Sequence, residues 1–329
     1  MAARLEAVPA VRTLDLLDLR KLSSGHINTL LEEETREWKE SLDWDFSKSA
    51  DLVRRFVDLR ALSGAALMAA GEAAGYSYCV VEEHKGLIGD LYVRRAWRTV
   101  ESEHRLLAAV LEGLITGSQV RRVESQLMMT LPQGARDMPG ANFLRTYERN
   151  FMLLDLDTAP QLAEGPARRR MHVEKWSDHY QESAAQLIAA AYAGHIDSHI
   201  NDQYRSVAGA RRFLYNIVQY PGCGSFFRPG SYVALDLERS RLLGLSLASV
   251  VGPESGHITQ ICAAPEVRGT GIGYELLRRS LLTLGELGSH RVSLTVTAAN
   301  RDAVELYERM GFRTRRRFSA YVWEGFGRG

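Results

Sequence analysis

The sequence predicts an α/β protein that contains two copies of one fold. With 329 residues and 45% hydrophobic content, the chain exceeds one usual domain and can bury two cores. Residues 257–277 change from an alternating apolar pattern to a glycine-rich loop and then to helix-forming residues, which indicates strand, loop and helix. A pattern that begins at Ile88 also recurs about 170 positions later.

The charge balance and the cysteines restrict the class of protein. Lys+Arg total 41 and Asp+Glu total 40, so we expect no nucleic-acid partner and no membrane-surface partner. Cys79, Cys223 and Cys262 lack a paired or CxxC spacing, which argues against a disulfide framework or a zinc site and fits a reducing compartment. No apolar run has transmembrane length and the N-terminus does not resemble a signal peptide, so we expect a cytoplasmic protein.

The first half is expected to contain helices, a meander of strands and a further helix and strand. The periodic patterns predict helical segments at 14–60, with a cap at Ser47, and at 106–115; strands at 65–70, 76–81, 87–93 and 123–128; and an amphipathic stretch at 143–149.

The second half follows a segment with two prolines, a glycine and a run of charges. This composition is typical of a solvated linker, so the expected division is 1–157, a linker at 158–170, and 171–329. The patterns then predict helices at 183–193 and 208–218, strands at 232–237, 242–251 and 258–263, the helix after the glycine loop, a strand at 292–297, a helix with Tyr307, and a strand at 317–323.

The internal repeat is in register over the strand, loop and helix. Ile88-x-x-Leu91-x-Val93, Arg98 and Leu106-Leu107 align with Ile258-x-x-Ile261-x-Ala263, Arg268 and Leu276-Leu277. Three shorter parallels are Arg54-Arg55-Phe56 with Arg211-Arg212-Phe213, Gly75-x-Ser77 with Gly244-x-Ser246, and Tyr147-Glu148-Arg149 with Tyr307-Glu308-Arg309. The halves are therefore expected to be two copies of one fold.

The glycine loop is predicted to hold a pyrophosphate. Gly269, Gly271 and Gly273 place no Cβ in the way of a ligand, and the N–H groups at the start of the next helix favour anions. The dinucleotide fingerprint would need a glycine where Tyr274 stands, and the P-loop would need Gly-Lys-Ser/Thr, which is absent. The spacing therefore excludes both common phosphate-binding motifs.

Two motifs in this half resemble those of the GNAT N-acetyltransferase family. Its acetyl-CoA motif, Arg/Gln-x-x-Gly-x-Gly/Ala after a strand, is matched by Arg268, Gly271 and Gly273. Its second motif, N-x-x-A-x-x-L-Y-x-x-x-G-F, is matched by Asn300, Ala303, Leu306-Tyr307 and Gly311-Phe312. The resemblance implies two tandem GNAT-like domains, each a mixed, mostly antiparallel twisted sheet flanked by helices and splayed open at the cofactor site. It also implies acetyl-CoA as cosubstrate and requires no metal.

The resemblance also implies roles for individual residues. The strand would bind the pantetheine arm through its backbone, even though its side chains pack in a core, and Asn300 would lie near the cofactor unless it is only a turn residue. The implied cofactor-binding residues are Ile261, Cys262, Ala263, Arg268, Gly269, Thr270, Gly271, Ile272, Gly273 and Asn300. Tyr307 lies on a helical apolar stripe that suits a core tyrosine, but the resemblance makes it the general acid toward the CoA thiolate.

The general base has several candidates. His257 opens the cofactor strand where some GNAT enzymes that acetylate protein lysines carry a catalytic Glu, and an imidazole of near-neutral pKa can accept a proton from an ammonium group. A solvated histidine at a strand end is the alternative interpretation. Glu254 is a second candidate base, and a base that acts through water is a third possibility.

Residues 192–204 are rich in His, Asp and Tyr. The pattern could suggest a metal site, but no cysteine or further ligand cluster accompanies it. In GNAT enzymes the loop after the first helix shapes the acceptor pocket, so the resemblance implies substrate contacts from Tyr192, His195, Asp197 and His199. Cys223 and Cys262 are expected to be small buried side chains, because no neighbouring base marks either as a nucleophile.

The first copy is expected to have lost the cofactor site. It keeps Arg98 in register with Arg268, but Thr99, Glu101 and Glu103 replace the three glycines. Two carboxylates would face the pyrophosphate position, and Cβ atoms would obstruct the close approach of the backbone. This copy should therefore pack against or shape the second site without binding CoA.

These inferences predict an N-acetyltransferase that moves acetyl from acetyl-CoA to a primary amine, by direct transfer, in its C-terminal copy. The expected partner is a small-molecule or peptide amine, and the expected state is a monomer or homodimer. One alternative is a non-catalytic acetyl-CoA-binding sensor or interaction protein. Another is a nucleotide-binding protein, which would lack the usual Lys or ribose-binding acid.

Overall fold

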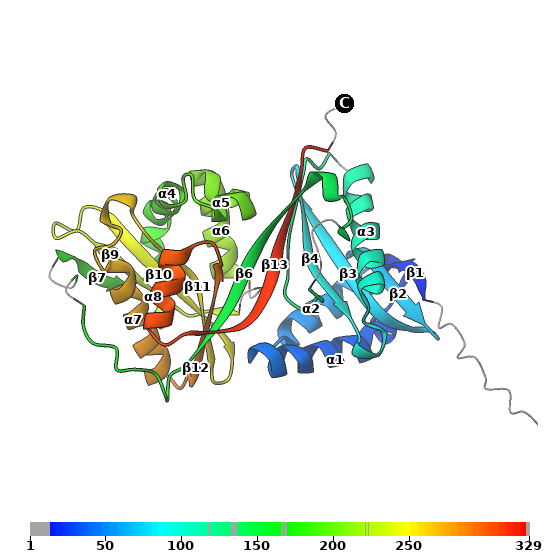
Figure 1. Ribbon diagram of the computed structural model, residues 1–329, viewed down its shortest axis with the longest axis horizontal. Helices are drawn as coiled ribbons and strands as arrows, with labels where there is room; N and C mark the ends of the chain where they lie inside the picture. Colours follow the sequence, from blue (N-terminus) through cyan, green and yellow to red (C-terminus); the bar gives the residue numbers. More distant parts are fainter. Residues whose placement is uncertain are drawn as a thin grey trace, which may run out of the picture.

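One continuous mixed sheet organises the molecule (Figure 1). The computed structural model describes residues 14–117, 119–132, 137–165, 167, 170–220, 222 and 224–326. Within these residues the sheet has thirteen strands in the order β1-β2-β3-β4-β5-β13-β6-β12-β11-β10-β9-β7, and β8 pairs with β10.

The strands of the first half are β1 (Asp15–Asp18), β2 (Ser63–Ala69), β3 (Glu72–Glu82), β4 (Lys85–Val93), β5 (Arg122–Leu127) and β6 (Leu144–Asp155). Those of the second half are β7 (His172–Lys175), β8 (Ser225–Phe226), β9 (Tyr232–Leu235), β10 (Leu242–Gly252), β11 (Ser255–Ala263), β12 (Arg291–Thr297) and β13 (Arg313–Glu324). The helices are α1 (Ser24–Leu42), α2 (Ser47–Asp58), α3 (Val100–Gly117), α4 (Gln181–Ala191), α5 (Asp197–Ile200), α6 (Val207–Gln219), α7 (Ile272–Glu286) and α8 (Arg301–Arg309).

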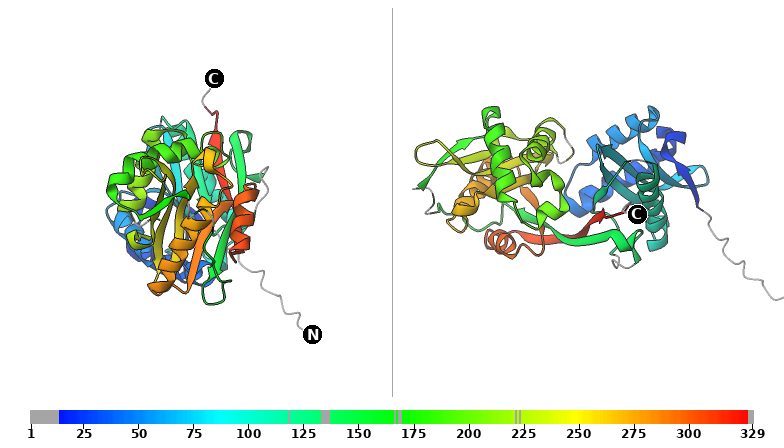
Figure 2. Two further views of the ribbon diagram at one scale, coloured as in Figure 1. Left: turned by 90° about the vertical axis from the view of Figure 1, so that its left-hand side faces the viewer. Right: turned by 90° about the horizontal axis from the view of Figure 1, so that it is seen from above.

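The last strand of each half pairs with the other half. Strand β6 lies antiparallel to β12, with Met152 opposite Leu294, and β13 lies antiparallel to β5, with Tyr321 opposite Ser125. Strands β6 and β13 also pair with each other and run side by side through the centre of the molecule (Figures 1 and 2). The division of the chain into two domains at residues 158–170 stays a prediction. Hydrogen bonds of the sheet join strands that precede this segment to strands that follow it.

The internal repeat is confirmed in the backbone. Strand β4 pairs in parallel with β5 only from Lys85 to Ile88, and β11 pairs in parallel with β12 only from Ser255 to Ile258. Strands β4 and β11 each contain a β-bulge where they pair with their antiparallel neighbour. The extra residue is Gly89 in β4 and Thr259 in β11. The two halves therefore repeat both the parallel pairing and the bulge that follows it.

One sequence parallel is wrong. Residues 147–149 lie in β6, whereas Tyr307–Arg309 lie in α8, and the predicted amphipathic stretch at 143–149 belongs to that long strand from Leu144 onward. The match covers three residues, and no shared periodicity in the flanking sequence supported it. The segment is a strand because β6 pairs with β12 and β13.

The predicted helical segment at 14–60 contains four elements. Strand β1 and a 3-10 turn precede α1, and α1 ends at Asp43, which adopts the left-handed conformation with φ of 56°. The connection to α2 is packed with aromatic rings: Trp38 stacks on Phe46 at 5.0 Å between centroids and meets Trp44 edge-on at 5.8 Å. This packing holds Trp44 next to the second half of the molecule.

Helices cover both faces of the first half because its strands alternate. Ala66 and Met68 of β2 pack with α1 and α2, whereas Ala65 and Leu67 pack with α3. In the second half, α4 and α6 share one core and α7 and α8 pack in others. The remaining predicted helices and strands are confirmed to within a few residues, and β7, β8 and α5 were not predicted. None of the described helices combines the length and the apolar character that spanning a membrane requires.

Candidate active site

The glycine loop has the conformation that its sequence predicts. Gly269 and Gly271 have φ of 74° and 90°, a region that residues with a Cβ rarely adopt, and Gly271 is the N-cap of α7. A Cβ built on Gly269 or Gly273 would meet no described atom within 4 Å. The first-turn N–H groups of α7 have no acceptor inside the helix, so they are available to an anion.

Arg268 ties this loop to the end of α4. Its guanidinium donates a hydrogen bond to the carbonyl oxygen of Ala191, near the C-terminus of that helix. The side chain is otherwise exposed beside the loop. This hydrogen bond joins the glycine loop, predicted to hold the pyrophosphate, to the start of residues 192–204, which we call the acceptor loop after their predicted role.

Strand β11 separates from β12 beside this loop. The parallel pairing ends at Ile258, and from Gln260 to Ala263 the strand pairs with β10 alone in the described sheet. The backbone edge that faces away from β10 is thus open to a ligand, apart from the Ile261 carbonyl oxygen, which accepts from the Tyr192 hydroxyl at 3.4 Å. The predicted splay of the sheet is present.

A cavity of about 1200 Å³ joins the loop and the open strand edge to the first half of the chain. Its walls include most of the residues predicted from the sequence: Tyr192, His195, Asp197, His257, Ile261, Cys262, Ala263, Arg268, Gly269, Gly271, Ile272, Gly273, Asn300 and Tyr307. First-half residues, among them Trp44 and Arg149, complete the wall. The structure therefore brings the two predicted sets, cofactor and acceptor, to one space.

Tyr307 presents its hydroxyl to this cavity. The side chain is buried against Phe312, at 6.0 Å between ring centroids, and among the described residues the hydroxyl has no hydrogen-bonding partner. Burial and the negative charge of Asp197 raise the pKa of Tyr307 well above its ordinary value of 10. The side chain is therefore a phenol at neutral pH and can donate a proton or a hydrogen bond.

His257 is a buried residue of the cavity wall, so a solvated strand-end histidine is excluded. Its Nδ1 lies 2.9 Å from the hydroxyl of Ser293, which in turn donates to the carbonyl oxygen of Gly256 at 3.3 Å. With the Ser293 hydroxyl donating to Gly256, Nδ1 would carry the ring proton and Nε2 would keep its lone pair. Burial lowers the pKa of His257 to about 4, which corrects the near-neutral value expected from the sequence.

Asp197 is held by a polar cluster. It accepts from the guanidinium of Arg149 at 3.3 Å and from the hydroxyl of Thr297, and its N–H lies 3.2 Å from Nδ1 of His195. The other nitrogen of His195 lies 3.3 Å from the side-chain amide of Asn300. The first turn of α8, which Asn300 caps, is thus linked to the acceptor loop.

A second cluster connects the acceptor loop to the bulged strand. The Gln260 amide donates to the Tyr192 hydroxyl at 2.9 Å, and the Tyr204 hydroxyl donates to the Gln260 oxygen at 3.2 Å. The two tyrosine rings stack at 4.4 Å between centroids. Cys262 is nearby, and burial raises the pKa of its thiol to about 12, so it stays a protonated thiol and not a nucleophile.

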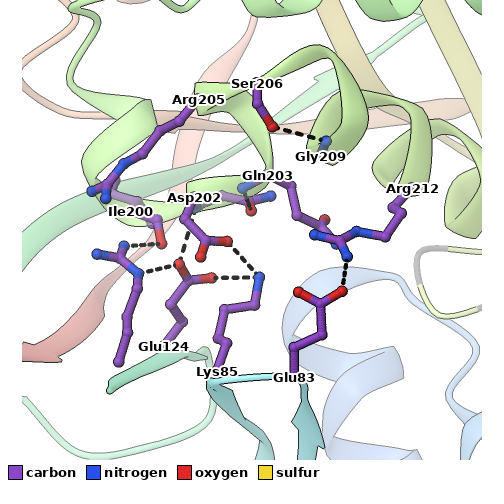
Figure 3. A network of polar contacts seen from close by, with 12 residues as sticks. Glu83, Lys85, Glu124, Ile200, Asp202, Gln203, Arg205, Ser206, Gly209 and Arg212 are labelled. Atoms are coloured by element: carbon purple, nitrogen blue, oxygen red, sulfur yellow. Dashed lines mark hydrogen bonds and ion pairs between the residues drawn. The ribbon is translucent and has the colours of Figure 1, made fainter. Parts of the chain in front are cut away.

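The first half holds the acceptor loop through buried ion pairs (Figure 3). The ammonium of Lys85 lies 2.6 Å from Asp202 and 3.6 Å from Glu124, and Glu124 also accepts from Arg122 at 2.5 Å. Arg122 in turn donates to the carbonyl oxygen of His199 at 2.6 Å. Strands β4 and β5 thereby position the segment that carries Asp197 and Tyr204.

Some predicted residues are not part of the cavity wall. Glu254 is exposed in the turn between β10 and β11, the His199 side chain is exposed, and Thr270 bonds back to the Val267 carbonyl oxygen at 2.7 Å. Among the described residues no group of His, Cys, Asp and Glu side chains has the arrangement of a metal site. Cys223 lies outside the described residues.

Sequence reasoning missed the wall residues that the first half supplies, and two of them contact predicted site residues. Trp44 lies 4.9 Å from the His257 ring, and Arg149 binds Asp197. Both come from the first half, and no local motif marks either as part of a site. The only available signal was the general expectation that the first copy shapes the second site.

The matching position in the first half is closed. Arg98 forms paired hydrogen bonds of 2.7 and 2.8 Å with Glu37, and although burial favours the protonated acid, these bonds lower the pKa of Glu37 to about 2. Glu103 is buried and accepts from the Leu131 N–H at 3.0 Å. The sequence had suggested that the Glu103 carboxylate faces the pyrophosphate position. In the structure this carboxylate is buried and does not face a ligand. The space beside it, lined by Leu91, Leu107, Leu127 and Tyr321 among others, leaves no volume for a water molecule.

Comparison with known proteins gives consistent matches. The model of the acetyltransferase (GNAT) family matches residues 194–312. A mycothiol acetyltransferase of Thermobispora bispora is 30% identical over 250 residues, which cover 73% of this chain and 77% of that protein. A mycothiol acetyltransferase of Propionibacterium freudenreichii is 26% identical over 182 residues, 54% of this chain and 55% of the relative, so the chain matches about half of that relative's length.

Solved structures show the same arrangement of elements. A GCN5-related N-acetyltransferase from Sphaerobacter thermophilus superposes with a TM-score of 0.68 at 17% identity, covering 94% of this chain and 95% of that one. A tandem GNAT protein from the clavulanic acid biosynthesis pathway has a TM-score of 0.60 at 16% identity, covering 95% of this chain and 98% of its own. At these identities the likeness concerns the fold alone, and it confirms the tandem architecture.

Proposed function

The chain belongs to the GNAT family of acetyltransferases and is an acyltransferase, and from this premise we propose that its C-terminal half transfers acetyl from acetyl-CoA to a primary amine. One observation carries the proposal. A single cavity joins an anion-binding helix start, an open strand edge, a buried phenol and a neutral imidazole.

The residues present fit acetyl-CoA. The first turn of α7 and the backbone of Gly269 and Gly271 would bind the pyrophosphate, since left-handed glycines and free N–H groups meet there. The open edge of β11 between Ile261 and Ala263 would hold the pantetheine arm through backbone hydrogen bonds. This fit supports acetyl-CoA over a nucleotide alone. A nucleotide site would need a Lys or a ribose-binding acid, and neither accompanies the glycine loop.

Direct transfer needs one proton acceptor and one proton donor. As the new C–N bond forms and the C–S bond breaks, Nε2 of His257 would take the proton from nitrogen, and Tyr307 would give a proton to sulfur. Both groups are in the required state at neutral pH, because burial keeps His257 neutral and Tyr307 protonated. Both would exchange protons with solvent before the next turnover.

We propose a single acetyl-CoA site per chain. In the first half Arg98 is engaged by Glu37, and the space beside Glu103 is filled by apolar side chains, which supports loss of the cofactor site there. The domain division at 158–170, a cytoplasmic location, a small-molecule or peptide acceptor, and a monomeric or dimeric state also stay predictions.

The test is release of CoA thiol from acetyl-CoA in the presence of a panel of primary amines, with the acetylated product identified by mass spectrometry. Gly271→Glu is the cofactor-site variant, because a side chain there is strained at φ of 90° and would place a carboxylate in the pyrophosphate cradle. Gly113→Glu is the matched control, since a Cβ at this exposed helical position meets nothing within 4 Å.

The proposal predicts amine-dependent thiol release in the wild type and in Gly113→Glu, and loss of both release and acetyl-CoA binding in Gly271→Glu. Binding of acetyl-CoA without thiol release from any amine would instead identify a sensor. Binding of ATP or NAD in place of acetyl-CoA, seen as a thermal shift, would identify a nucleotide-binding protein.

A further inference from the structure

The part of the cavity wall that comes from the first half is apolar. Its side chains are supplied by the end of α1, by α2 and by the neighbouring strands. We call the following residues the aromatic lobe: Trp44, Phe46, Leu52, Phe56, Tyr78 and Met128. Besides the hydroxyl of Tyr78, the first-half residues that add polar groups to this wall are few: Ser49, Asp90, Gln126 and Arg149.

Two residues of the lobe are exposed inside the cavity and not packed in a core. Leu52 and Phe56 are 40% and 43% exposed, and they lie one helical turn apart on α2. Phe213 of α6 lines the same cavity from the second half. Apolar side chains that remain exposed within a cavity indicate an apolar ligand, because burying them against water-excluding groups is favourable.

The aromatic lobe is continuous with the proposed reacting groups. The Trp44 ring lies 4.9 Å from the His257 ring, and the Phe151 ring lies 6.5 Å from both of these rings, between centroids, and stacks on His257. An acceptor whose nitrogen reaches His257 therefore has the indole of Trp44 as its next neighbour. The cavity of about 1200 Å³ also exceeds the upper end of the usual range for one small-molecule pocket, roughly 1,000 Å³, so an acceptor has room beside the cosubstrate arm.

The charge of this wall is small. Asp90 accepts from the Tyr76 hydroxyl at 3.3 Å, and the same hydroxyl lies 3.0 Å from the buried carboxyl of Glu34. Burial raises the pKa of both acids, which disfavours the doubly ionised state of the pair. Arg149 of this wall is paired with Asp197, so the wall accommodates a cationic amine, and the scarcity of hydrogen-bonding groups among its first-half residues disfavours a polyhydroxylated acceptor.

We propose that the acceptor is a primary amine with a bulky apolar group, aryl or branched alkyl, that packs in the aromatic lobe while its nitrogen reaches His257. This inference rests on the proposed N-acetyl transfer and names its substrate class. The reaction converts the ammonium and acetyl-CoA to the N-acetyl amide, CoA thiol and one proton. The same chemistry is offered by a free amine and by a peptide with an apolar N-terminal residue.

The first test compares amines by kcat/KM for CoA release. Phenethylamine and 3-methylbutylamine carry the apolar group, ethanolamine and glucosamine carry hydroxyls, and a short peptide with N-terminal phenylalanine separates the two sources. We expect the apolar amines to exceed the hydroxylated ones by about 10- to 100-fold, the usual range for filling an apolar pocket. Equal or higher kcat/KM for ethanolamine or glucosamine would overturn the inference.

The second test uses the two exposed lobe residues, whose replacement removes little core packing. Phe56→Gln and Leu52→Gln should lower kcat/KM for phenethylamine at least tenfold more than for ethanolamine. Leu59→Gln is the matched control, because Leu59 ends the same helix, is 62% exposed and lies outside the cavity wall. An equal loss for both amines, or the same loss in Leu59→Gln, would refute a role of the lobe in acceptor choice.

A binding measurement separates this inference from the proposed function. Phenethylamine and ethanolamine are titrated by calorimetry into the CoA-bound protein, in the wild type and in Phe56→Gln. Selective binding of phenethylamine that Phe56→Gln weakens would support the lobe even if no acetyl group is transferred, in which case only the proposed function fails. Turnover of hydroxylated amines without selective phenethylamine binding would leave the function intact and refute the lobe.

Discussion

Burial of His257 should make the stability of the protein depend on pH in a specific window. The imidazole has an ordinary pKa of 6.5, and burial lowers it to about 4 in the folded protein. The contribution of the neutral ring is fully present above about pH 6.5. It is lost as the pH falls toward 4, because only the unfolded chain binds the proton in that window.

The size of the effect follows from the two pKa values. The difference between 6.5 and about 4 corresponds to a maximum of about 3 kcal/mol, of which about 2 kcal/mol is already lost at pH 5. The side chain is 6% exposed, so solvent screens little of this free energy. Urea unfolding at pH 7 and pH 5, followed by tryptophan fluorescence, measures the loss.

His257→Gln is the decisive variant, since it removes the titrating group and keeps a polar side chain beside Ser293. The wild type should lose about 2 kcal/mol more than this variant between pH 7 and pH 5. His290→Gln is the control. Asp157 raises the pKa of His290, so protonated His290 stabilises the fold at low pH, and replacing His290 cannot abolish the loss of stability that comes from His257. Equal acid sensitivity in wild type and His257→Gln would refute the burial argument. If His257 is also the base, the acid limb of kcat/KM should fall near pH 4 and disappear in the variant.

Three further predictions concern Tyr307, cofactor stoichiometry and the ion pairs of Figure 3. Tyr307→Phe should lower kcat by roughly 10- to 1,000-fold with little change in acetyl-CoA affinity. The control Tyr215→Phe, at an exposed tyrosine, should change neither quantity. Unchanged turnover in Tyr307→Phe would remove Tyr307 from the chemistry. Calorimetry should give one acetyl-CoA per chain, and a stoichiometry of two would mean that the first half opens around Glu103. Lys85→Met should lower the free energy of unfolding by about 2 kcal/mol because it removes one of the two cations that face buried Glu124 and leaves Arg122 as the other, against less than about 1 kcal/mol for Arg211→Met in an exposed pair; equal losses would show that burial adds nothing.

Local patterns in the sequence were enough to predict the elements around the glycine loop. Gly269 and Gly271 occupy the left-handed conformations that make glycine necessary, and the alternating and helical patterns on either side continue into β11 and α7. The repeat likewise predicted that the two halves share one fold, and the structure shows the same bulge in both, at Gly89 and at Thr259. The local conformation depends on residues that are close together in the chain, so it can be predicted from the sequence pattern.

The tertiary structure alone decided which of the candidate residues share a space. Glu254 and His257 are three positions apart, yet one is exposed in a turn and the other is buried against Trp44 and Phe151. Arg149 reaches Asp197 because β6 pairs with β12, although the two strands belong to different halves. Burial, pKa and contact all depend on pairings between residues far apart in the chain. The free energy of those pairings comes from apolar surface that the whole sheet buries at once, which no local pattern records.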